Sequence, residues 1–131
     1  ELDAAMTASF AEIPAERRAL VTNHHVFGYL ADRFGFRLVG AVIPGGTTLA
    51  APSTSDLADL VAAIDEAGVP TVFAESSSPD RLVRALADEA DRQVAVTELF
   101  TESLTDADGG APDYLTMMRV NTERIRSGLV P

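Results

Sequence analysis

The sequence contains no cysteine, lysine or tryptophan among its 131 residues. Without cysteine, disulfides, zinc–thiolate sites, iron–sulfur clusters and thiol nucleophiles are all excluded. The ten basic residues are all arginine, and 20 acidic residues give the chain a net charge of −10. Because phosphate backbones repel such a chain, no nucleic acid is expected as a partner. The surplus of acid is compatible with a soluble protein that handles cations, or simply with solubility.

Long apolar runs are also missing. No segment approaches the ~20 apolar residues that a membrane-spanning helix needs, and none has the composition of a signal peptide. The chain begins at Glu1 rather than at a methionine, which is compatible with a fragment or a processed product. The length suits one domain, and the 47% of hydrophobic and 23% of charged residues predict an ordinary globular protein.

Short apolar runs alternate with amphipathic segments along the chain. The runs at 17–22, 38–43, 71–74 and 94–96 predict four buried strands. Helical spacing of apolar residues predicts helices over 2–13, 26–34, 55–67, 79–86 and 114–125. Strands that alternate with helices indicate βαβ units. We therefore expect an α/β fold in which a four-stranded parallel sheet carries helices on both faces.

Polar side chains that can bind metals follow three of the predicted strands. His24 and His25 come after the first strand, Glu75 after the third, and Glu98 and Glu102 after the fourth. Since ligands of open parallel sheets bind beyond the carboxyl ends of the strands, these side chains should share one rim. Imidazole and carboxylate together suit a cation such as zinc or manganese. Two or three ligands leave a site incomplete, so others would have to come from elsewhere.

Each of these residues also has a structural interpretation. His24 could cap a helix or form an ordinary hydrogen bond. Glu75 could pair with an arginine of the following helix, and Glu98 and Glu102 could lie in solvent. Both interpretations stay open on the pattern alone.

An enzymatic interpretation is weaker. Ser76, His24 and Glu102 could be drawn as a nucleophile, a base and an acid, but no G-x-S-x-G motif surrounds Ser76. The segment 44–48 lacks the lysine and the spacing of a phosphate-binding loop. A small α/β hydrolase that uses Ser76 or a bound metal is the enzymatic alternative.

Four segments of the chain resemble the motifs of one family. They are 22–30 (T-N-H-H-V-F-G-Y-L, against H-D-A-F-G-Y-F), 72–77 (V-F-A-E-S-S, against F-A-E or F-V-E-S-S), 99–104 (L-F-T-E-S-L, against F-T-D-S-I) and 114–121 (Y-L-T-M-M-R-V-N, against Y-x-x-M-M-x-x-N). The family is that of the zinc- and manganese-specific substrate-binding proteins of ABC importers, including the zinc-uptake and lipoprotein-adhesin groups. The resemblance covers essentially the whole chain.

The resemblance implies two α/β lobes that are joined by a long helix and hold the metal between them, with two ligands from each lobe. Residues 1–13 would be the end of the connecting helix, and residues 14–131 the C-terminal metal-binding lobe. His24 would be the first ligand of this lobe. Glu102 would be the second, at a position where the family usually has Asp, and Glu75 would orient His24 from behind. His25 replaces the usual Asp of the first motif.

The resemblance also implies a function without turnover. The receptor would capture zinc or, alternatively, manganese in the periplasm or at the extracellular face of the membrane, with a lipid anchor through a missing N-terminus as one arrangement. Because manganese-type members often carry Glu where His24 stands, zinc is favoured. The expected partners are an ABC permease and an N-terminal lobe of the same receptor, which is missing here. A stand-alone interaction module, which exposes the face that would meet that lobe, is the remaining alternative.

Overall fold

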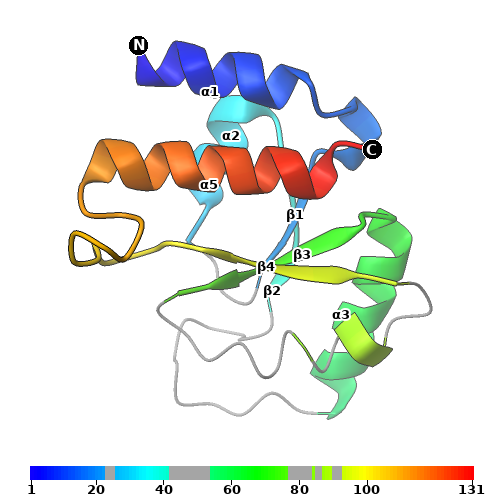
Figure 1. Ribbon diagram of the computed structural model, residues 1–131. Coiled ribbons are helices and arrows are strands. Elements are labelled where there is room, and N and C mark those ends of the chain that lie inside the picture. Colours follow the sequence, from blue (N-terminus) through cyan, green and yellow to red (C-terminus); the bar gives the residue numbers. More distant parts are fainter. Residues whose placement is uncertain (23–25, 42–53, 77–83, 85–86, 90–92) are drawn as a thin grey trace.

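The fold is taken from a computed structural model that describes residues 1–22, 26–41, 54–76, 84, 87–89 and 93–131 (Figure 1). In chain order the elements are α1 (Leu2–Ala11), the 3-10 helix η1 (Ala15–Arg17), β1 (Ala19–Thr22), α2 (Gly28–Phe34), β2 (Arg37–Ala41), α3 (Thr54–Ala67), β3 (Thr71–Glu75), β4 (Ala95–Leu99) and α5 (Tyr114–Leu129). Residues 42–53 and most of 77–92, which include the helix predicted from Pro79, lie outside the described part of the chain.

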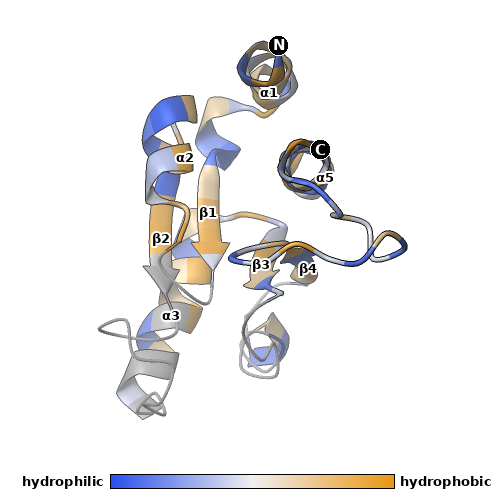
Figure 2. Ribbon diagram, turned by 90° about the vertical axis from the view of Figure 1, so that its left-hand side faces the viewer, coloured by the Kyte–Doolittle hydropathy of each residue, from blue (hydrophilic) through white to orange (hydrophobic). Residues whose placement is uncertain are grey.

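The four strands form one parallel sheet in the order β2-β1-β3-β4. Helices α1, α2 and α5 lie on one side of the sheet in Figure 1, and α3 lies on the other. Every residue of β1 and of β3 is buried, as expected for strands that are covered on both faces. The α/β fold predicted from the sequence is therefore confirmed, and Figure 2 shows the apolar character of β1.

Two predicted strand ends are wrong by two or more residues within the described part of the chain. The first strand begins at Ala19 rather than at Arg17, because residues 15–17 form a 3-10 helix. The fourth strand runs to Leu99 instead of ending at Val96, so Glu98 lies within it and does not follow it. The cause is that β4 is an edge strand in which only Leu99 is fully buried, and its polar residues Thr97 and Glu98 interrupted the apolar run.

Helix α1 belongs to the core of this domain. Phe10 is 2% exposed, and its ring makes edge-to-face contacts with Phe34 and Phe36 at centroid distances of 5.1 and 5.0 Å. On the surface, Arg126 of α5 bonds Glu12, just beyond the end of α1, at 3.0 Å. Aromatic burial of this kind stabilises far more than an exposed ion pair does.

Helix α5 begins at a side-chain cap. Asp113 accepts hydrogen bonds from the backbone N–H and the hydroxyl of Thr116, at 2.9 and 2.7 Å. The backbone bond, followed by the hydroxyl bond, lowers the pKa of the Asp113 carboxyl below its ordinary value. A lowered pKa means that the charged cap stabilises the fold above the ordinary pKa, and that this contribution is lost as the pH falls through the lowered one.

We expect Asp113→Ala to lower the melting temperature by a few degrees at pH 7, and Asp113→Asn, which keeps an acceptor, to lower it less. The difference in melting temperature between the parent chain and Asp113→Asn should shrink as the pH is taken below about 4. The reason is that the Asp113 carboxyl of the parent chain becomes protonated there, whereas the amide of the variant does not titrate. Calorimetric melting between pH 7 and pH 3 measures both effects. A gap that widens toward low pH would contradict the assigned pKa direction.

Candidate metal site

The order of the strands creates a switch point in the sheet. From β1 the chain moves outward to β2, and it then returns across β1 to β3. Ligands of such sheets bind in the crevice beyond the carboxyl ends of the strands at this point. Ser76 follows β3 there, and residues 100–102 follow β4. His24 and His25 lie outside the described residues, so the predicted contribution of His24 to the site stays a prediction.

Glu102 lies in a tight turn just after β4. Its side chain is exposed, and its φ is 60°. Among the described residues it is the only non-glycine residue with a positive φ. Across it, the N–H of Ser103 donates to the carbonyl of Thr101 at 2.7 Å. Three-residue turns with a positive φ at the centre are rare and strained, and a backbone of this kind costs roughly 1–3 kcal/mol. Such strain is found most often at functional sites.

The segment that carries Glu102 is held on two sides. The N–H of Ser76 donates to the carbonyl of Leu99 at 2.8 Å, and the N–H of Thr101 donates to the hydroxyl of Ser76 at 3.1 Å. From the other side, the buried Asn121 of α5 accepts from the N–H of Phe100 at 2.9 Å and donates to its carbonyl at 2.8 Å. The sequence pattern predicted neither contact, although Asn121 stands in one of the resembling motifs.

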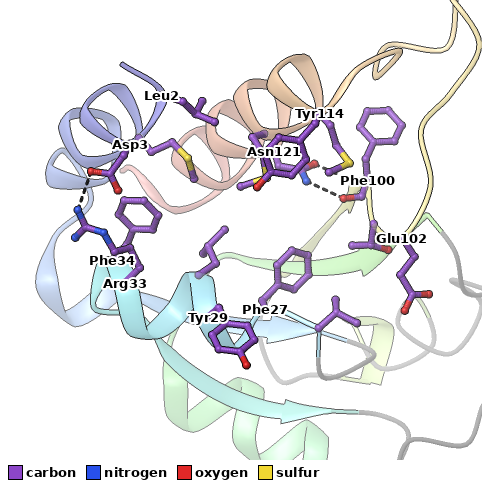
Figure 3. Close-up of a pocket in the computed structure, with 16 residues that line it drawn as sticks. Leu2, Asp3, Phe27, Tyr29, Arg33, Phe34, Phe100, Glu102, Tyr114 and Asn121 are labelled. Atoms are coloured by element: carbon purple, nitrogen blue, oxygen red, sulfur yellow. Dashed lines mark hydrogen bonds and ion pairs between the residues drawn. The ribbon is translucent and has the colours of Figure 1, made fainter.

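A cavity of about 510 Å³ opens between α1, α2, α5 and residues 100–102 (Figure 3). Most of its wall is apolar, and it includes Met6, Phe27, Phe34, Met117 and Met118. Glu102 lines it as well, and in Figure 3 its carboxylate points away from the contact between Asn121 and Phe100. Tyr29 and Tyr114 also belong to its lining, and they are 94% and 58% exposed.

The other predicted carboxylates lie differently. Glu75 is the last residue of β3 and is 1% exposed, so it lies inside the fold. Glu98 is the exposed next-to-last residue of β4, so it lies within the strand and does not follow it as predicted. Its carbonyl accepts from Arg124 at 2.8 Å. Glu102 therefore remains as the exposed candidate ligand that follows a strand.

The described part of the chain lacks two features. Among its residues, which exclude both histidines, no group of three or more His, Cys, Asp or Glu side chains is placed to hold a metal ion. Within the same part, no helix has the length and apolarity needed to cross a membrane.

The hydroxyl of Ser76 has a structural contact. It accepts the hydrogen bond of the Thr101 N–H and so ties the end of β3 to the turn after β4. The predicted nucleophile is therefore part of the framework that supports Glu102.

The chain resembles known proteins along nearly its full length. A family model described as the zinc-uptake complex component A, periplasmic, matches residues 1–128. The zinc-binding protein TroA of Treponema pallidum is 35% identical over 98% of this chain and 42% of its own length. The zinc-binding protein AdcA of Streptococcus pyogenes serotype M1 is 33% identical over 96% of this chain and 24% of its own length. The manganese ABC transporter substrate-binding lipoprotein PsaA of Streptococcus anginosus is 27% identical over 98% of this chain and 41% of its own length.

A solved structure gives the same result. The periplasmic zinc-binding protein TroA superposes with a TM-score of 0.89 and 34% identity, over 99% of this chain and 48% of that one. Fold and matches together define one lobe of a metal-binding receptor. The chain belongs to the periplasmic zinc-uptake component A family, ZnuA, and spans less than half the length of the curated relatives it matches.

Proposed function

We propose that this chain supplies the C-terminal half of a divalent-metal site in a receptor that delivers its ion to an ABC permease. Capture would take place in the periplasm or at the extracellular face of the membrane. The observation that carries the proposal is the strained turn that presents Glu102 beyond the carboxyl edge of the sheet. His24 and Glu102 would bind the ion, and Glu75 would orient His24. The ion is cargo, so no reaction is catalysed.

Zinc is the favoured ion. Neutral imidazole and carboxylate are both established zinc ligands. The relatives TroA and AdcA are named as zinc-binding proteins, whereas PsaA is named as a manganese-transporter component. A histidine at position 24 supports the zinc side of this division.

The missing ligands would come from an N-terminal lobe that covers the open side of the cavity. Large aromatic side chains as exposed as Tyr29 and Tyr114 are typical of surfaces that meet another protein surface. Leu2 and Asp3 of α1 line the same cavity, so residues 1–13 would lead to that lobe as the end of a connecting helix, and residues 14–131 would form the metal-binding lobe. The TroA structure is about twice as long as its matched part, which supports this arrangement.

The proposal predicts weak binding alone and tight binding with the second lobe. Calorimetric titration should show that this chain binds zinc weakly and more tightly than manganese. The same titration with the part of TroA that this chain does not match should show tighter zinc binding, because two further ligands become available. Zinc binding that is unchanged by that addition would contradict the half-site. Tighter binding of manganese than of zinc would contradict the choice of metal. Hydrolysis of generic ester or phosphate substrates would favour the enzymatic alternative instead.

A further inference from the structure

Asn121 is a buried polar side chain on α5 that touches the segment carrying Glu102. It is 3% exposed, and its amide forms two hydrogen bonds to the backbone of one residue, Phe100. A neighbouring strand would satisfy a strand residue in the same way, through one donor and one acceptor. The amide group offers both functions in one plane, which neither a carboxylate nor an apolar side chain of similar size can do.

The two bonds begin where the sheet ends. Leu99 is the last residue of β4, and its carbonyl accepts from Ser76. Asn121 then fixes Phe100, and Arg124, one turn further along α5, lies over the Phe100 ring at 4.5 Å from its centroid. Helix α5 thus holds both the backbone and the ring of the residue that leads into the turn.

The turn that follows needs such support. A positive φ at a residue such as Glu102 persists only where the surrounding structure over-determines it. Only Thr101 separates the clamped Phe100 from Glu102, and the Ser103–Thr101 bond closes the turn. A shift of the strand end would therefore carry the carboxylate with it.

We propose that Asn121 is a positioning residue for the Glu102 carboxylate, through its two bonds to Phe100. The inference rests on the proposed function, because it takes Glu102 as a metal ligand. Asn121 would not touch the ion. It would act as the residues behind metal ligands do, whose removal typically weakens binding about 10- to 100-fold.

The test compares zinc affinity in five variants by calorimetry, each beside its melting temperature. Asn121→Ala should weaken zinc binding about 10- to 100-fold. Asn121→Asp, which keeps the acceptor for the Phe100 N–H but sets a carboxylate oxygen against the Phe100 carbonyl, should weaken it as well. Thr122→Val is the matched control, because Thr122 is buried beside Asn121 and its hydroxyl bonds only within α5, to Met118 at 2.7 Å. It should lower the melting temperature and leave the affinity unchanged.

The fourth variant is Glu102→Ala, and the fifth combines it with Asn121→Ala. In that background the loss of Asn121 should weaken zinc binding no further, because a positioning residue acts through the ligand it positions. Parent affinity in Asn121→Ala, an equal further loss in the Glu102→Ala background, or an equal loss in Thr122→Val would each overturn the inference. Parent affinity in Glu102→Ala, or no zinc binding by the parent chain, would overturn the proposed function and this inference with it.

Discussion

Replacing Glu102 or His24 with alanine is expected to weaken zinc binding by more than about 100-fold. Each change removes one of the two ligands that this lobe is proposed to contribute. Residues behind the ligands already cost about 10- to 100-fold on removal, so loss of a ligand should exceed roughly 100-fold. Calorimetric titration with zinc, before and after each substitution, measures the effect.

The chain offers matched controls for this experiment. Glu98→Ala removes an exposed carboxylate from the strand just before the turn and should leave the affinity unchanged. Glu102→Gln preserves the size of the side chain and removes its charge, so it should fail as Glu102→Ala does. Binding should also weaken below the ordinary imidazole pKa of ~6.5, since a protonated histidine cannot bind the ion. If Glu98→Ala and Glu102→Ala lost zinc affinity equally, the effect would come from the net charge of the chain and not from the loss of a ligand.

Replacing Phe10 with alanine is expected to cause the largest loss of stability. The ring contacts Phe34 and Phe36, is almost fully buried and joins α1 to the rest of the domain. Its removal leaves a cavity at this contact. Substitutions of this kind cost about 3–5 kcal/mol, a large fraction of the stability of an ordinary domain. Urea unfolding followed by circular dichroism measures the free energy of unfolding.

The control for Phe10 lies one turn before it on the same helix. Thr7 is exposed, and its hydroxyl bonds only the carbonyl of Asp3 within α1. Thr7→Ala should therefore change the free energy of unfolding by less than about 0.5 kcal/mol. A loss below about 1 kcal/mol in Phe10→Ala would mean that α1 is not anchored in this domain.

The sequence predicted the sheet because its central strands are simple to read. Both faces of β1 and β3 are covered, and most of their residues are apolar, which made these strands recognisable. The extent of β4 could not be read in the same way, since this edge strand is only partly covered and its polar residues at 97 and 98 resembled a loop. The central strands were therefore easier to predict than the edge strand, and the sequence does not state which strand lies at the edge.

The candidate site was predictable only in part. A carboxylate after the fourth strand could be expected from the order of the elements, and Glu102 lies there. Its positive φ could not be expected, because glutamate has no preference for that conformation. The clamp from Asn121 joins residues 21 positions apart and depends on how α5 packs on the sheet. No local pattern carries that information.

Strand β4 lies at one edge of the sheet, where another chain could pair with it and cause aggregation. Edge strands offer unpaired backbone groups to other chains, and proteins often protect them with lysine, which this sequence lacks. Since the Leu99 carbonyl turns inward to Ser76, the adjacent Glu98 carbonyl faces outward, where Arg124 binds it. An arginine from α5 thus occupies an acceptor that an incoming strand would need. The chain blocks edge-to-edge association at this point with the one strongly basic residue type it has.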